Sequence, residues 1–300
     1  MIGIVDNWSL DVLHRHSRYL LRRVAEAIDS ELELGDVSRA FIRCHLPVIV
    51  HGTPSRLRGV IGSAEVLRKA LTREQYERFL KDCSLVFDYE AFSRRDLPGW
   101  GAYALCIESR YTMCPYCHQA FAHTLVPMGG GRFRPTLDHY YPKKKYPYLA
   151  LSIYNLVPSC YTCNSQLKGG KDFYQKKHLH PYEEMDDRIE CVFDVKEYLR
   201  RRVAGDGRYE MVLRHKNNAA SRSISCFALD RRFSINERYL DSYVARVIDY
   251  VMCKEGRSAY RARIGFDLSE ADLIGFDSAN YKNEMLGKIK LDLYALVLLM

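Results

Sequence analysis

The sequence predicts an α+β protein that is mainly helical, with a cysteine-bracketed module at its centre and a small antiparallel hairpin after that module. Three observations predict this fold class. Apolar residues recur at helical spacing toward both ends, two Cys-x-x-Cys pairs enclose a segment rich in Tyr, Pro, Lys and Gly, and two short alternating runs follow that segment. We therefore divide the 300 residues into a helical region 1–98, a module 99–182 and an α+β region 183–300 that ends in helices.

Helices are predicted throughout the first region. One apolar run has three- and four-residue spacing and comprises Val12, Leu13, Leu20, Leu21, Val24 and Ile28. Thr72 and Gln75 have the spacing of a capping box and precede a second such run. Turn residues in "VIVHGTPSRLRGVIG" predict an interruption between the two runs, and "DLPGWG" at 96–101 is the clearest boundary signal in the chain.

Strands and further helices are predicted beyond the module. Two runs alternate between apolar and polar residues; they are Ile189, Cys191, Phe193 and Val195, then Tyr209, Met211 and Leu213. "GDG" at 205–207 lies between them, so we expect an antiparallel hairpin. Asn236 is placed to cap a following helix, and the last seventeen residues are expected to form a final packed helix.

The ten cysteines do not indicate a secreted disulfide protein. Four form the two pairs, and six stand singly among apolar neighbours: Cys44, Cys83, Cys106, Cys191, Cys226 and Cys253. This pattern favours a reducing compartment, one metal site and inert core thiols. The longest apolar stretch, "LDLYALVLLM", is too short to span a bilayer, and no targeting segment is evident at the N-terminus. We expect a soluble, cytoplasmic protein without a membrane partner.

The two cysteine pairs predict a structural zinc site. Its ligands would be Cys114, Cys117, Cys160 and Cys163, because Zn²⁺ favours four tetrahedral thiolates and each tight Cys-x-x-Cys turn presents two. We expect one zinc ion per chain. His118 and His123 could also ligate, but four thiolates suffice. The 42 residues between the pairs exceed the ~15–20 of a simple zinc ribbon, so the zinc would staple the two ends of an insert.

The insert carries most of the positive charge. Residues 132–180 hold nine Lys or Arg and two Asp, a local charge of +7 in a chain of +8. Such a concentrated field attracts polyanions such as nucleic acid, although a solvated lysine loop would show the same composition. Four tyrosines of the insert could stack on bases, but packing of the small module is favoured. They are Tyr140, Tyr141, Tyr146 and Tyr148.

Polar residues of the insert follow a recognisable order. Asp138 and His139 are adjacent in "LDHYYPKKKYP", Asn155 follows in "YNLVP", and Asn164 comes directly after the last cysteine. This Asp-His…Asn…Cys-x-x-Cys-Asn…Lys pattern, with a cysteine pair upstream, resembles the zinc-braced form of the HNH endonucleases, which contain a ββα-metal centre. The resemblance covers 114–182. It implies a strand-turn-strand carrying the Asp-His pair and a helix starting near Cys163.

The resemblance and simple chemistry assign expected roles. A neutral imidazole, with a pKa near ~6.5 when free, can take a proton from water, so His139 is the expected general base. Asp138 and Asn164 would offer oxygen ligands to a catalytic Mg²⁺ or Mn²⁺. By resemblance, Asn155 would hold the loop that orients the imidazole without touching the metal. The expected nucleic-acid contacts are Lys143, Lys144, Lys145, Lys168 and Lys171; for Lys168, a solvated helix lysine is an equal alternative.

A narrower resemblance concerns "YPKKKYPYLALSIYNLVPSCYTCNSQLKGG" followed by "HPYEE". It is most similar to the nuclease subunits of Septu-type anti-phage systems, which implies a defence role beside an ATPase partner, with DNA favoured over RNA as substrate. The main alternative is a non-catalytic, zinc-stapled module that binds nucleic acid through its basic face. The flanking regions 1–98 and 183–300 could also serve as a partner-docking scaffold.

Overall fold

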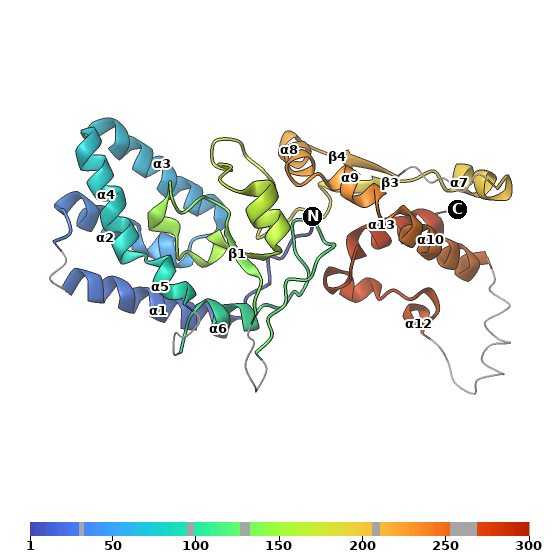
Figure 1. The fold of residues 1–300 in the computed structure, drawn as a ribbon, viewed down its shortest axis with the longest axis horizontal. Coiled ribbons are helices and arrows are strands. Elements are labelled where there is room, and N and C mark those ends of the chain that lie inside the picture. The colour runs from blue at the N-terminus through green and yellow to red at the C-terminus, as the bar shows by residue number, and fades with distance from the viewer. Residues whose placement is uncertain (30–32, 95–98, 127–132, 206–210, 253–268, 300) are drawn as a thin grey trace.

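The computed structural model describes residues 1–29, 33–94, 99–126, 133–205, 211–252 and 269–299. The molecule is elongated (Figure 1). Its N-terminal helices lie at one end of the long axis, its C-terminal helices at the other, and strand β1 lies between them. The prediction of a mainly helical α+β fold with small antiparallel hairpins is confirmed.

The elements of the N-terminal part are α1 (Leu10–Asp29), α2 (Asp36–His51), α3 (Pro54–Ala70), α4 (Arg73–Val86), α5 (Tyr89–Ser93) and α6 (Ala102–Ile107). Those of the centre are β1 (Thr136–His139), η1 (Pro147–Leu149), η2 (Ile153–Asn155), β2 (Leu156–Ser159) and η3 (Thr162–Lys168). The C-terminal part contains β3 (Ile189–Val192), α7 (Val195–Val203), β4 (Val212–His215), α8 (Asn218–Phe227), α9 (Leu229–Ser234), α10 (Glu237–Met252), α12 (Glu270–Ile274), η4 (Ser278–Asn283) and α13 (Gly287–Leu298).

The N-terminal helices follow the apolar periodicity. The predicted capping box is present at the start of α4, where the Gln75 N–H donates to the Thr72 hydroxyl and the Thr72 N–H donates to the Gln75 side chain. The interruption predicted between the helical runs is shorter than expected. Only Gly52 and Thr53 separate α2 from α3, because Pro54 fits the first turn of a helix, where no N–H is needed.

The central elements follow one another as strand, strand and helical turn. Strands β1 and β2 pair antiparallel, with His139 opposite Leu156. Helical turn η3 follows, and in it the Gly169 N–H donates to the Asn164 carbonyl at 2.8 Å, five residues back. This wide π-type spacing places residues four apart on a common face, so that Asn164 and Lys168 share one side of the turn.

The C-terminal hairpin differs from the prediction in its connection. Strands β3 and β4 are antiparallel as expected, but α7 lies between them. The helix begins at Val195 because the Asp194 side chain accepts the Glu197 N–H at 2.9 Å, which caps it. Phe193 and Val195 were predicted to belong to the strand, but β3 ends at Val192. Tyr209 lies outside the described residues.

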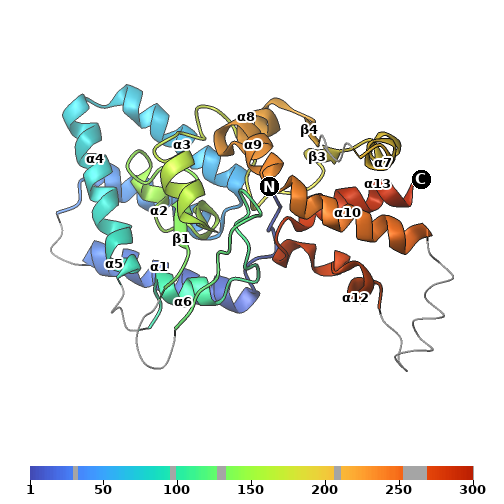
Figure 2. The same cartoon turned by 45° about the vertical axis from the view of Figure 1, so that its right-hand side comes forward.

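The two long C-terminal helices fall close to their predicted positions. Helix α10 starts directly after Asn236, whose amide donates to the Arg232 carbonyl. Helix α13 lies within the last seventeen residues and packs beside α10 (Figure 2). Among the described residues, no helix combines the length and the apolar content that crossing a bilayer requires.

The N-terminal helices pack onto the inserted segment. The Tyr148 ring contacts Phe41 and Phe79, with ring centroids 5.2 and 6.0 Å apart. The His16 Nε2–H donates to the Leu151 carbonyl at 2.7 Å, and the Trp100 indole N–H donates to His16 Nδ1. The predicted packing role of the tyrosines is confirmed, since all four are buried: Tyr140, Tyr141, Tyr146 and Tyr148.

The single cysteines are mostly core residues, as predicted. Buried thiols are found at Cys83, Cys106, Cys191 and Cys226. Cys44 was predicted to be a core thiol, but it is exposed because it lies on the outer side of α2, away from the buried Phe41 and Ile42. Cys253 lies outside the described residues.

Two buried histidines predict acid lability. Burial lowers the pKa of His16 to about 4 and that of His180 to about 3. Between those values and the ~6.5 of an unfolded imidazole, the unfolded chain binds a proton at each position and the folded chain does not. The free energy of unfolding should therefore fall as the pH drops below ~6.5, by up to ~1.4 kcal/mol per pH unit for each histidine.

Urea unfolding at pH 7, 6 and 5 measures this slope. His16→Gln should show a smaller loss of stability per pH unit than the wild-type protein. His14→Gln, which replaces an exposed histidine of the same helix, is the matched control. Equal slopes for the wild type and His16→Gln would show that the buried His16 does not contribute to the loss of stability at low pH.

Candidate functional site

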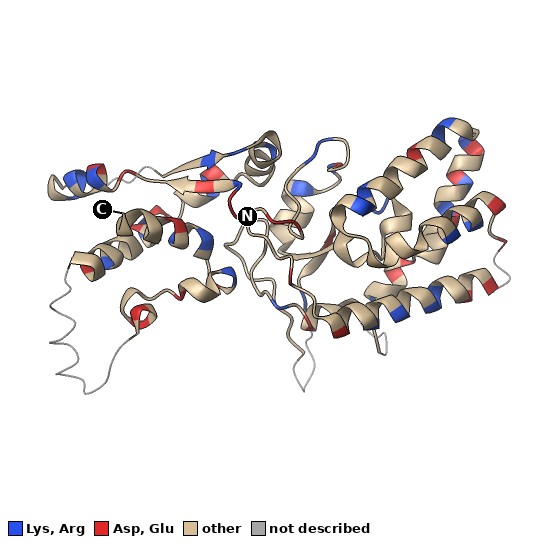
Figure 3. Cartoon of the chain, turned by 180° about the vertical axis from the view of Figure 1, so that it is seen from behind, with Lys and Arg blue, Asp and Glu red and all other residues tan. Residues whose placement is uncertain are grey.

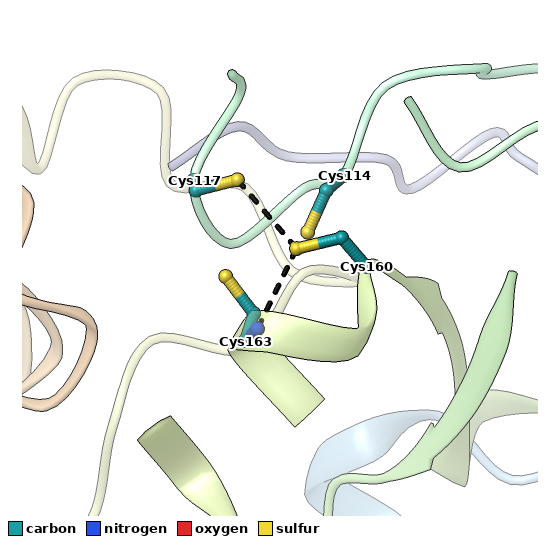
Figure 4. Close-up of side chains that lie close together, drawn as sticks. All are labelled: Cys114, Cys117, Cys160 and Cys163. Atoms are coloured by element: carbon teal, nitrogen blue, oxygen red, sulfur yellow. Dashed lines mark hydrogen bonds between the residues drawn. The ribbon is translucent and has the colours of Figure 1, made fainter. Parts of the chain in front are cut away.

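The four cysteines of the two pairs lie together at one end of the insert. Their sulfur atoms are all within 4.8 Å of one another, and Cys117 Sγ is 4.0 Å from Cys160 Sγ (Figure 4). Sulfurs that bind zinc tetrahedrally at ~2.3 Å lie about 3.8 Å apart, whereas a disulfide requires about 2.05 Å. The cluster could therefore hold a zinc ion. Among the described residues, it is the one group of three or more Cys, His, Asp or Glu side chains placed to share a metal.

Neighbouring residues complete the surroundings of this cluster. Arg232, from α9, donates from Nη1 to Cys163 Sγ at 3.3 Å. Four thiolates around Zn²⁺ carry an excess of negative charge, which a guanidinium offsets. His118 is not a ligand, because its ring nitrogens bond to the Lys282 carbonyl and the Lys288 N–H.

A cavity of about 390 Å³ lies beside β1 and η3. It is lined by Asp138, His139, Pro142, Lys143, Lys144, Lys145, Asn164, Lys168, Gly169 and Gly170. The structure therefore brings most of the predicted site residues to one place. Asn155 and Lys171 are the two predicted site residues, apart from the cysteines, that do not line it.

His139 is held in one orientation and one tautomer. Its Nε2 lies 2.9 Å from the Ala150 carbonyl oxygen, which can only accept, so Nε2 carries the hydrogen. Within the described part of the chain, nothing bonds to Nδ1, which is left with a free lone pair. The Tyr89 ring packs edge-on against the imidazole at 4.4 Å between centroids.

Burial changes the acidity expected of this imidazole. Burial lowers the pKa of His139 to about 3; the bond to Ala150 opposes the shift, and the charges of Lys143 and Lys168 add to it. The pKa of ~6.5 expected from the sequence is that of a free, solvated imidazole. In the folded protein the ring is therefore neutral at pH 7, because burial of the side chain disfavours its charged form.

Asn155 lies behind the cavity, completely buried. Its side-chain oxygen accepts the Tyr141 N–H at 2.7 Å, and its amide nitrogen donates to the carbonyls of Tyr141 and Leu149. These bonds tie together both ends of the loop between Tyr141 and Ala150. Asn155 therefore fixes the carbonyl that orients His139 and does not itself reach the cavity.

Asp138 forms a buried network with two residues that the sequence analysis did not connect to it. Lys168 donates to Asp138 Oδ1 at 2.8 Å and to the His139 carbonyl at 2.7 Å. The Tyr116 hydroxyl donates to Asp138 Oδ2 at 2.6 Å. Asp138 and Lys168 are each only 2% exposed. The alternative of a solvated helix lysine is therefore wrong for Lys168, because its ammonium neutralises a buried carboxylate.

The remaining lysines differ in how available their charge is. Lys143 pairs with Glu90 of α5, and Lys145 pairs with Asp172 at 3.2 Å. Lys144 is exposed and forms no ion pair with any described residue. Lys171 faces away, donating to the Leu167 carbonyl and toward Cys226 Sγ.

The net charge of the insert is therefore larger than the positive charge at the cavity that is not paired with an acid. Elsewhere on the molecule, Lys and Arg also lie along α1 and α7, as the view from behind shows (Figure 3).

Three contributors to the site were missed by sequence reasoning: Tyr116, Tyr89 and Glu90. Tyr116 stands inside the first cysteine pair, so its position there was a signal that could have been used. Tyr89 and Glu90 lie about fifty residues before the residues they contact, and nothing local connects them to the site.

A scan against protein-family models and searches of curated proteins and solved structures found no match to this chain. The site is therefore interpreted from its geometry and from the motif resemblance.

The cysteine cluster predicts that the native protein contains about one zinc ion per chain. Cys117→Ser should lose the zinc and unfold at a much lower temperature, because thiolate zinc sites contribute ~10–16 kcal/mol in small peptides. Cys44→Ser, which alters an exposed thiol, should retain both zinc and stability. Elemental analysis and thermal melting measure these outcomes; a metal-free native protein with four titratable thiols at this site would contradict the interpretation.

Proposed function

We propose that this chain is an endonuclease of the HNH type that hydrolyses phosphodiester bonds of nucleic acid, with DNA as the favoured substrate. The observation that supports it most strongly is the convergence of Asp138, His139 and Asn164 on one cavity. Strand β1 contributes the first two, and the turn after the last cysteine contributes the third. A binding module would not need these three side chains together.

His139 has several properties of a general base, although burial lowers its pKa and so weakens its affinity for a proton. Its Nδ1 lone pair is free, its ring is neutral, and the Ala150 carbonyl stabilises the positive charge that the ring acquires on taking a proton. Asn155 donates to the carbonyl of the preceding residue, Leu149, and so holds the backbone that carries the Ala150 carbonyl. The water that His139 would deprotonate enters through the cavity that its ring lines.

Asp138 and Asn164 would hold a Mg²⁺ or Mn²⁺ ion. Both line the cavity with oxygen-bearing side chains, the donors that hard cations prefer. The Asp138 carboxylate, which attracts the Lys168 ammonium, offers the negative charge that such an ion would need. When bound, the ion supplies charge stabilisation at the phosphate and the departing alkoxide. Zinc at the four cysteines would be separate and structural.

A role in anti-phage defence, beside an ATPase partner, is part of the proposal. It is supported by the resemblance of the segment from Tyr141 to Gly170, with "HPYEE" after it, to Septu nuclease subunits. The N-terminal and C-terminal helices, which do not line the cavity, would be the surface for such a partner. Localisation in the cytoplasm belongs to the same proposal.

Replacement of His139 tests the catalytic role. His139→Ala should lower the cleavage rate ~10²–10⁴-fold, because the proton acceptor is lost, while binding of nucleic acid persists. His123→Ala removes an exposed imidazole of the same module that does not line the cavity and should cleave at the wild-type rate. The assay follows plasmid and RNA with Mg²⁺ or Mn²⁺, with the protein alone and with any ATPase that co-purifies. If the protein binds nucleic acid but cleaves it under none of these conditions, the endonuclease proposal is refuted. The non-catalytic binding module is then the remaining interpretation.

The unpaired lysine predicts the salt dependence of binding. Lys144→Gln should reduce the slope of log affinity against log salt by about one unit, since each phosphate contact releases close to one counterion. Lys143→Gln, whose charge is already paired with Glu90, should change the slope less. Fluorescence anisotropy of a labelled duplex between 50 and 300 mM NaCl, without divalent ions, measures the slope. An unchanged slope in Lys144→Gln would indicate that nucleic acid binds elsewhere on the molecule and not at this cavity.

A further inference from the structure

The ion pair between Lys168 and Asp138 is the most unusual feature of the cavity. Its two charges are 2.8 Å apart and almost completely buried. The ammonium also donates to the His139 carbonyl and lies 5.1 Å from the centre of the Phe173 ring. Lys168 is therefore held firmly at the carboxylate that the proposed function assigns to a divalent cation.

Both oxygens of this carboxylate already accept hydrogen bonds, Oδ1 from Lys168 and Oδ2 from Tyr116, and a second cation at close range would be repelled by the ammonium. An ion coordinated by Asp138 would lie within a few ångströms of the Lys168 ammonium, in a buried setting where water screens repulsion poorly. The ammonium therefore opposes binding of a divalent ion at Asp138, and binding is favoured when the ammonium withdraws. Asn164 and Lys168 stand on the same side of the π-type turn, so the second metal ligand and the competing charge belong to one short segment.

The charges around the cavity indicate when replacement of the Lys168 ammonium by a divalent ion is favourable. Asp138 and Lys168 neutralise each other, Lys143 and Lys145 are paired with acids, and Lys144 adds one positive charge. A divalent ion would raise the local charge from about +1 to about +3. A phosphate entering the cavity offsets this excess and offers the released ammonium a new partner.

We propose that Lys168 is an internal competitor for the catalytic cation. In the free protein its ammonium occupies the cation position beside Asp138 and keeps divalent-ion affinity low; when a phosphate of the substrate enters, the ammonium passes to the phosphate and Asp138 binds the ion. The identity of the phosphate donor, a nucleic acid, rests on the proposed function. The competition itself rests on the Lys168–Asp138 contact.

Direct binding of Mn²⁺ tests the competition without any cleavage assay. The free Mn²⁺ signal in electron paramagnetic resonance gives the affinity of the full chain without nucleic acid. Lys168→Gln keeps hydrogen-bond donors and removes the charge, so it should bind Mn²⁺ at least ~10-fold more tightly than the wild type. Lys168→Arg keeps the charge and should bind as weakly as the wild type.

Two further variants test whether the gain in Mn²⁺ affinity arises at Asp138. Lys144→Gln removes an equal charge from the same cavity without freeing Asp138, so it should change Mn²⁺ affinity much less. Asp138→Asn combined with Lys168→Gln should lose the gained affinity. Zinc content and thermal melting show whether each variant is folded. If Lys168→Gln does not fold, the wild type and Asp138→Asn are compared with and without a DNA duplex, after subtraction of the Mn²⁺ that the duplex binds alone, and a gain of at least ~10-fold is expected in the wild type only.

Equal Mn²⁺ affinity in folded Lys168→Gln and wild type would overturn the competition, and so would wild-type affinity that a duplex leaves unchanged. These results are distinguishable from failure of the proposed function. Cleavage by the wild type with unchanged affinities would refute only the competitor role. Tighter Mn²⁺ binding by Lys168→Gln, with no cleavage by any form, would refute only the nuclease.

Discussion

The meeting of the four cysteines, a cluster that could hold a zinc ion, is the contact on which the central part of the molecule depends. It joins the turn at 114–117 to the turn at 160–163, across 42 intervening residues. Strands β1 and β2 lie inside this closed segment, and η3 begins at its end. A small module with two short strands has little core of its own, so a zinc ion bound at this cluster would close its ends and remove conformational freedom that packing alone would have to overcome.

The cavity is lined by residues of the central part, but all three parts of the chain contact the side chains and backbone around it. Helix α5 supplies Tyr89 against the His139 ring, and α1 supplies His16, which bonds to the backbone next to Ala150. From the other side, Phe227 of α8 stacks on Tyr116 at 4.5 Å, and Tyr116 in turn donates to Asp138. Changes in the flanking helices can therefore alter the geometry of Asp138 and His139 through direct contacts.

Sequence reasoning succeeded where the signal is local. The capping box at Thr72 and the paired cysteines are short patterns whose geometry follows from a single turn. It failed where distant segments meet. Burial of Lys168 depends on its fit between Asp138 and Phe173, and neutralisation of Lys143 depends on Glu90 of another helix. Helix α7 was missed because one alternating run continued past the residue that caps it.

One feature of the N-terminal region gives the protein an internal optical reporter. The chain contains two tryptophans, and the indole N–H of Trp100 donates to His16, whose opposite nitrogen holds the Leu151 carbonyl. Indole emission depends on hydrogen bonding and on nearby charge, and the Arg15 guanidinium lies 4.6 Å from the centre of this ring. With the other indole replaced as Trp8→Phe, the fluorescence of Trp100 would follow movements of the loop behind His139 in real time, without any attached dye.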